Sequence, residues 1–178
     1  MPRQTKPPAT PRAVSSGPRG TLEVDWSFFG ELSRALALRV AREYDPEVVL
    51  GIARAGVMPG VVVASIMQRE FASMTVTRQG REAPILVSGP PATIRGRRVL
   101  LVDASCDTGD TIKLALAEVR ALQPAEVRTA VVFRTGPYKA DYAAFETESF
   151  AVLPWDREII RNGEVVARPD YAARLGGG

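Results

Sequence analysis

The sequence predicts an α/β fold, a mostly parallel twisted sheet with helices on both faces. Short apolar runs alternate along the chain with segments of helical spacing, and strands that alternate with helices are typical of parallel sheets. The chain has 178 residues, of which 46% are hydrophobic, so it can bury one sizeable core. We therefore expect one main domain over residues 21–178, after a basic, Pro-rich tail over residues 1–20.

The first expected helix begins near Asp25 or Ser27 and ends at about Tyr44, because the Asp45-Pro46 pair disfavours further helix. Apolar residues recur every four positions along it, as in a helix with one buried face: Phe28, Leu32, Leu36 and Val40. The pattern then predicts three more elements in order, a strand over 47–52, a helix over 59–69 and a strand over 71–78.

Residues 79–98 are rich in Gly, Pro and Arg, and their one apolar run is Ile85-Leu86-Val87. This run predicts one arm of a β-hairpin. A long, uneven connection inside a compact domain is often functional. The alternation is completed by a strand over 99–102, a helix over 112–122 and a strand over 127–133.

The most informative segment is VLLVDASCDTGDT, residues 99–111. A buried strand, a turn of small residues and a helix N-terminus form an anion site, because backbone N–H groups and the helix dipole favour negative charge there. The turn adds hydroxyl donors and a permissive backbone position: Thr108, Thr111 and Gly109. Asp103 and Asp107 stand beside it, and this combination suits a ribose phosphate. The alternative is an ordinary turn in which Asp107 and Thr108 cap the helix.

Composition excludes several chemistries. Histidine is absent, which removes His-based triads, His general bases and His metal sites. Cys106 is the single cysteine, so no intramolecular disulfide forms and we expect a reducing, cytoplasmic location. No apolar run reaches the length of a membrane span. The net charge is +3, and we expect the basic tail to be disordered and solvated rather than bound to nucleic acid.

Residues 99–111 resemble the phosphoribosyl-diphosphate (PRPP) motif of type I phosphoribosyltransferases. That motif is an apolar strand, two acids, two variable residues and then Asp-Thr-Gly-x-Thr. The first acid is Asp103 here, and Ala104 replaces the second. The resemblance implies that Asp103 binds the ribose. It also implies that the 5′-phosphate is held by Asp107, Thr108, Gly109, Asp110 and Thr111.

A second segment, residues 53–57, is similar to the pyrophosphate loop of the same family. The resemblance implies that the diphosphate is bound by Arg54, Ala55 and Gly56. The alternative is an ordinary turn with a solvated Arg54. The basic residues that flank the uneven connection are further candidates for closing over the diphosphate, and the alternative for each of them is a solvated basic loop: Arg78, Arg81, Arg95 and Arg97.

A third segment, FAVLPWD over residues 150–156, is similar to the base-binding hood of bacterial xanthine-guanine phosphoribosyltransferases. Phe150 stands where that family has a Trp, and Arg134 ends a strand whose basic residue contacts the purine O6. The resemblance thus implies a small C-terminal hood over about residues 134–170. The alternative for Phe150 and Trp155 is plain core packing.

The resemblance implies transfer of ribose 5-phosphate from PRPP to a 6-oxopurine (guanine, xanthine or hypoxanthine) with release of pyrophosphate, as in purine salvage. Asp107 would be the catalytic residue that handles the proton on N7. The base would be bound by Arg134, Phe150 and Ala151. The resemblance also implies Mg²⁺ as cofactor, with Asp103 and Asp156 as candidate ligands, and a homo-oligomer, a dimer or a tetramer.

Ala104 is the chief departure from the family pattern. A methyl group cannot accept hydrogen bonds from the ribose, and losing a charged acceptor costs about 1 to 3 kcal/mol. An alternative function is therefore a PRPP- or nucleotide-binding regulator on the same fold, with weak or no catalysis. An enzyme for a pyrimidine or another acceptor is less favoured, because Arg134 and Phe150 fit a 6-oxopurine.

Overall fold

The computed structural model describes residues 13–14, 20–78 and 82–169, which form two compact units. The first, called the sheet unit, is Glu31–Thr147. The second, called the terminal unit, combines Met1–Gly30 with Glu148–Gly178. The sequence predicted a hood from about residue 134, but the chain between there and residue 147 stays in the sheet unit.

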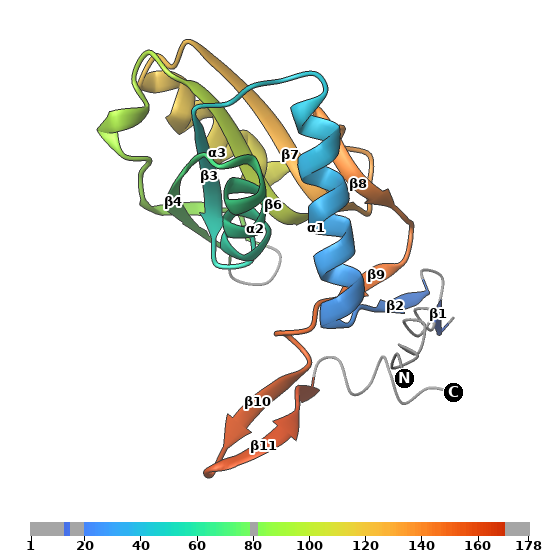
Figure 1. Ribbon diagram of the computed structural model, residues 1–178. Helices are drawn as coiled ribbons and strands as arrows, with labels where there is room; N and C mark the ends of the chain where they lie inside the picture. The colour runs from blue at the N-terminus through green and yellow to red at the C-terminus, as the bar shows by residue number, and fades with distance from the viewer. Residues whose placement is uncertain (1–12, 15–19, 79–81, 170–178) are drawn as a thin grey trace, which may run out of the picture. The chain divides into compact units, whose positions relative to one another are not determined.

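The sheet unit contains one six-stranded sheet in the order β5-β4-β3-β6-β7-β8 (Figure 1). Its strands are β3 (Val48–Ala53), β4 (Glu70–Thr77), β5 (Ile85–Ser88), β6 (Arg98–Cys106), β7 (Glu126–Arg134) and β8 (Tyr142–Glu146). All neighbours are parallel except β5, which runs antiparallel to β4. The mostly parallel sheet and the hairpin arm are therefore confirmed. β8 is a strand that the sequence did not predict.

Helices cover both faces of this sheet, as predicted. They are α1 (Trp26–Ala41), α2 (Val57–Met67) and α3 (Asp110–Ala121), with a short 3-10 turn, η1 (Ala92–Ile94). The chain moves from β3 through α2 to β4 in one direction, and from β6 through α3 to β7 in the other. Right-handed crossovers in opposite directions place α2 and α3 on opposite faces, and Figure 1 shows α2 in front of the sheet and α3 behind it.

Local chemistry explains where these elements begin and end. Asp25 caps α1, because its Oδ1 accepts the N–H of Phe28 at 2.7 Å. The predicted apolar stripe of α1 is buried at Leu32, Leu36 and Val40. The strand predicted over 99–102 was too short, since β6 continues to Cys106. Pairing with β7 holds the extra residues extended.

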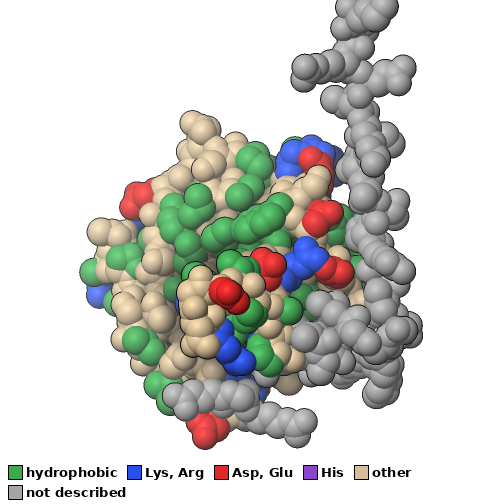
Figure 2. Space-filling view, turned by 90° about the horizontal axis from the view of Figure 1, so that it is seen from below, with side chains coloured by type: hydrophobic (Ala, Val, Ile, Leu, Met, Phe, Trp, Pro, Cys, Tyr) green, Lys and Arg blue, Asp and Glu red, His purple; other side chains and the backbone are tan. Residues whose placement is uncertain are grey.

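The core between the sheet and α3 is built from alternating strand residues and one helix face. It includes Val48, Leu50, Ile52, Val99, Leu101, Ile112, Ala115 and Val119. Other apolar side chains reach the surface, and Figure 2 shows several of them gathered on one face. Within the described ranges, no helix has the length and apolar character needed to cross a membrane.

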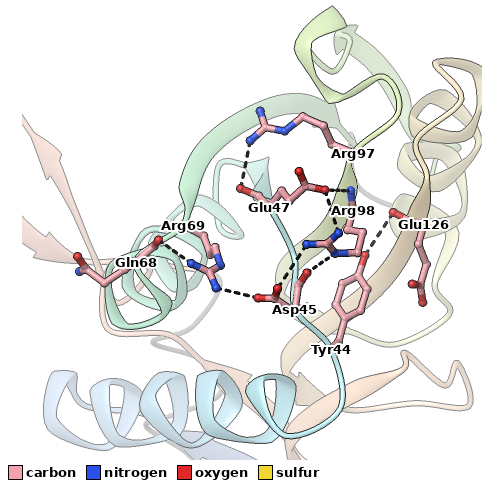
Figure 3. A network of polar contacts seen from close by, with 8 residues as sticks. All are labelled: Tyr44, Asp45, Glu47, Gln68, Arg69, Arg97, Arg98 and Glu126. Carbon is pink, nitrogen blue, oxygen red and sulfur yellow. Dashed lines mark hydrogen bonds and ion pairs between the residues drawn. The ribbon is translucent and has the colours of Figure 1, made fainter.

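A polar network closes the amino-terminal edge of the sheet (Figure 3). Arg98 Nε donates to the Asp45 carbonyl at 2.6 Å, and Glu47 Oε2 accepts the Arg98 N–H at 3.0 Å. Arg97 pairs with Glu70 at 2.8 Å in the same region, and Arg95 bonds the Gln123 side chain at 3.2 Å. The expectation that Arg95 or Arg97 closes over a diphosphate is therefore wrong. Both lie at the edge opposite the carboxyl ends of the parallel strands.

The terminal unit holds two small sheets. One is β1 (Ala13–Val14), β2 (Thr21–Glu23) and β9 (Phe150–Val152), and the other is the hairpin of β10 (Glu158–Arg161) and β11 (Glu164–Ala167). The half-buried Trp155 ring packs on Trp26 and Phe29, with centroids 5.7 and 4.8 Å away. Apart from β1 and Gly20, the predicted disordered tail lies outside the described residues.

Candidate functional site

The strand order places a ligand site between β3 and β6. These two central strands are neighbours, and the chain leaves them in opposite directions. In open parallel sheets, ligands bind beyond the carboxyl ends of the strands at such a switch point. The loops that follow the two strands adjoin there: a Cβ on Gly56 would overlap the Val102 carbonyl oxygen and lie 2.9 Å from Asp103 Cα. Only glycine lets the Arg54–Gly56 loop approach β6 this closely.

A cavity of about 190 Å³ opens at the end of β6 and the start of α3. Its walls are Arg78, Asp103, Ser105, Cys106, Asp107, Thr108, Gly109, Asp110, Thr111 and Ile112. The structure therefore brings together every residue that the PRPP motif predicted for the phosphate and the ribose. It adds Arg78, from the end of β4, as the cationic residue of the wall.

The N-terminus of α3 supplies hydrogen-bond donors to this cavity. The first N–H groups of a helix have no partner within the helix. The residue before α3 is Gly109, which has φ 79° and provides no side-chain cap. The N-cap position of α3 is thus Gly109, and not Asp107 or Thr108. The N–H groups of the first turn and the positive end of the helix dipole favour an anion at this turn.

A loop after β7 supports the phosphate turn from the side. The Thr135 N–H donates to the Cys106 carbonyl at 2.9 Å, and the Tyr138 N–H donates to the Asp107 carbonyl at 3.3 Å. Cβ atoms placed on Gly136 or Gly109 would overlap Asp107 and Tyr138, respectively. The sequence reasoning missed these residues. The run Thr135-Gly136-Pro137-Tyr138 could have indicated them. It directly follows a predicted strand, so it lies at the same edge of the sheet as the phosphate turn.

Asp103 is the buried acid of the site, with 9% of its surface exposed. Its Oδ1 accepts the N–H of Ala104 at 2.7 Å. Burial raises the pKa of Asp103 to about 7, and this hydrogen bond offsets part of the rise. Ala104 itself is fully buried and is not part of the cavity wall.

Cys106 also lines the cavity but cannot act as a nucleophile at neutral pH. Burial, followed by the charges of Asp103 and Asp107, raises the pKa of its thiol to about 12. A thiol with such a pKa remains protonated and unreactive. The chemistry of the cavity thus rests on its carboxylates, its hydroxyls, its backbone donors and the guanidinium of Arg78.

The remaining predicted residues lie around the cavity or in the other unit. Arg54 is exposed on the loop after β3. Arg134 ends β7, where its guanidinium pairs with Glu146 of β8. Phe150 and Ala151 lie in β9 of the terminal unit, so their contact with a base stays a prediction. Arg81 lies outside the described residues.

The two candidate acids, Asp103 and Asp156, differ in how well they fit Mg²⁺. Within residues 13–14, 20–78 and 82–169, no group of three or more His, Cys, Asp or Glu side chains could hold a metal ion. Mg²⁺ often binds through one or two carboxylates together with substrate phosphates and water. Asp103 fits that mode, because it lies on the cavity wall. Asp156 fits it less well, because its carboxylate bonds Arg168 at 3.0 Å.

Known proteins share this architecture. A family model described as "Phosphoribosyl transferase domain" matches residues 25–161. A solved purine phosphoribosyltransferase from Pyrococcus horikoshii Ot3 is 28% identical, with a TM-score of 0.71 over 80% of this chain and 98% of that one. The xanthine-guanine-hypoxanthine phosphoribosyltransferase of Helicobacter pylori is 17% identical, with a TM-score of 0.59 over 75% and 91% of the two chains. At that identity it shows the fold alone. No curated protein matches the sequence.

Proposed function

Because the chain belongs to the phosphoribosyl transferase domain family, we propose that it transfers the ribose 5-phosphate of PRPP to a 6-oxopurine base. In this reaction the bond between C1′ and the diphosphate oxygen breaks, and a bond forms between purine N9 and C1′. The products are a nucleoside monophosphate and pyrophosphate. The N-terminus of α3, which lines the cavity together with Asp103 and Asp107, is the observation that carries the proposal.

The phosphate turn binds and orients PRPP. The first backbone N–H groups of α3 and the hydroxyls of Thr108 and Thr111 hold the 5′-phosphate. Asp103 accepts hydrogen bonds from the ribose hydroxyls at the end of β6. Arg54 lies on the adjoining loop and contributes positive charge to the departing diphosphate. Asp107 takes the proton from purine N7 as N9 attacks C1′.

A purine acceptor is supported by two observations. The solved structure with 28% identity, which this chain covers almost completely, is a purine phosphoribosyltransferase. In addition, Arg134 stands at the carboxyl end of β7, where a donor to the purine O6 is needed. Its pairing with Glu146 keeps the guanidinium fixed at that edge. We assign Phe150 to stacking on the base and the Ala151 backbone to its C2 edge.

Asp103 is the residue that would hold Mg²⁺, in concert with oxygen atoms of PRPP. When bound, the ion would neutralise charge on the diphosphate leaving group. Asp103 is suited to this role because it is the buried carboxylate of the cavity wall.

The proposal is tested by pyrophosphate release. The full chain is incubated with PRPP, MgCl₂ and guanine, hypoxanthine or xanthine, and we expect release with at least one base. The Asp107→Asn variant serves as the matched control, because it keeps the shape of the side chain and removes the proton acceptor. PRPP binding without release for any base would overturn the transferase and support the regulator.

A further inference from the structure

The carboxylate of Asp110 lies where an anion-binding turn would be expected to avoid negative charge. Asp110 is the first residue of α3, and its side chain lines the cavity. The family resemblance assigned this position to the 5′-phosphate, a role that its backbone N–H can fill. The Asp110 carboxylate cannot bind the 5′-phosphate, because the two anions repel each other.

This carboxylate gathers the donors that surround the phosphate turn. Its Oδ2 accepts the Thr108 hydroxyl at 2.7 Å and lies 3.5 Å from Nη2 of Arg78. Its Oδ1 lies 3.6 Å from Nζ of Lys113, which also donates to the Thr108 carbonyl at 3.0 Å. A hydroxyl and two cations around one pair of oxygens is an arrangement that equally suits a phosphate.

Asp110 is ionised at neutral pH. The hydrogen bond from Thr108, together with the charges of Lys113 and Arg78, lowers the pKa of its carboxyl. The Asp110 and Arg78 side chains are 39% and 36% exposed, so water screens this pair. A screened ion pair is weak enough for a ligand with greater charge to displace it.

We propose that Asp110 is an internal competitor for the ligand's phosphate, which displaces its carboxylate from Thr108 and Arg78. Arg78 then becomes a further phosphate-binding residue of the site. This inference rests on the proposed function, because it requires a phosphorylated ligand in the cavity. The competition with Asp110 also makes the site selective among anions. A phosphate monoester dianion carries more charge than the carboxylate that it replaces, so the site prefers it to a singly charged anion.

The test is calorimetric titration of the full chain with guanosine 5′-monophosphate and with inorganic phosphate at fixed ionic strength. Asp110→Asn keeps the shape of the side chain and removes its charge. Removing one charge near a dianion at water-like screening is expected to tighten binding roughly 5- to 30-fold. Asp110→Ser, which also suits a helix start, should tighten binding similarly.

Glu118→Gln is the matched control, because Glu118 is an acid of the same helix about 12 Å further along the axis. We expect it to change the affinity less than twofold. Adding Arg78→Gln should weaken phosphate binding more in the Asp110→Asn protein than in the wild type, because Asp110 no longer competes for the guanidinium.

The outcomes separate the two proposals. Binding by the wild type with no tightening in either Asp110 variant would overturn the competitor role and leave the proposed function standing. A helix-start role alone would lower the melting temperature of Asp110→Asn without raising its anion affinity, which also counts against the competitor. If neither the wild type nor the variants bind either probe, both proposals fall.

Discussion

Asp103→Asn is expected to stabilise the fold above neutral pH while weakening PRPP binding. Burial raises the pKa of Asp103 from 3.8 to about 7, so the folded protein holds this proton more tightly than the unfolded chain. Stability from this group is therefore fully present below the unfolded pKa and is lost as the pH rises toward the folded pKa. The difference between the two pKa values corresponds to about 4 kcal/mol.

The stability lost through ionisation of Asp103 depends on pH. About two fifths of this stability, somewhat under ~2 kcal/mol, is already lost at pH 5, and nearly all of it is lost at pH 8. Asn does not titrate, and its amide oxygen can still accept the Ala104 N–H. The difference in unfolding free energy between Asp103→Asn and the wild type should therefore grow by about 2 to 3 kcal/mol between pH 5 and pH 8.

Urea unfolding followed by circular dichroism at pH 5, 6.5 and 8 measures this difference. The titration of every other group is common to both proteins and cancels. Glu118→Gln is the control for loss of an acid outside the cavity, and its difference from the wild type should stay flat. A flat difference for Asp103→Asn as well would refute the reasoning, because the carboxyl would then titrate alike in the folded and unfolded protein. PRPP affinity of the variant should fall by about tenfold, from the loss of a charged acceptor.

Three further changes test the roles in the site. Asp107→Asn should lower kcat by about 100-fold or more and change the KM for PRPP little, as expected for loss of a general base; an unchanged kcat in steady-state assays would remove Asp107 from proton handling. Phe150→Ala should raise the KM for the base about tenfold through lost stacking, with PRPP affinity retained, whereas a collapse of PRPP binding would make Phe150 a core residue. Gly136→Ala should abolish PRPP binding, because its Cβ would overlap Asp107, while Gly89→Ala, with nothing within 4 Å of the added Cβ, should bind as the wild type does.

The sequence predicted the parts of this protein that local patterns determine. The apolar runs of β3 and β6 and the turns after them are continuous in sequence, so the phosphate turn could be located and its residues do line one cavity. The sequence did not predict β8, because the short run over residues 142–146 is not directly bounded by clear turn residues. The β10–β11 hairpin was detectable, since Asn162 and Gly163 form a turn with φ 54° and 82°, a strong hairpin signal.

Contacts between distant segments could not be predicted. Nothing in the sequence shows that Gly136 lies against Asp107, or that Arg97 faces Glu70 rather than a ligand. Both follow from strand order, which decides at which edge of the sheet each loop emerges. Whether a basic residue precedes or follows its strand decides the edge of the sheet at which it lies. Arg97 precedes β6 and lies at the amino-terminal edge, whereas Arg78 follows β4 and lies on the cavity wall.

The two edges of the sheet differ in whether their charged groups are paired. At the amino-terminal edge, Arg98 is matched by Asp45 and Glu47, and each group has a nearby partner of opposite charge (Figure 3). At the carboxyl edge, the fold keeps a buried carboxylate at Asp103 and a glycine, Gly109, at the N-cap of α3. Each feature costs stability in the free protein. A ligand that brings both a phosphate and hydroxyl groups would compensate for both at once, and this is why the destabilising features of the sheet unit point to a phosphoribosyl group.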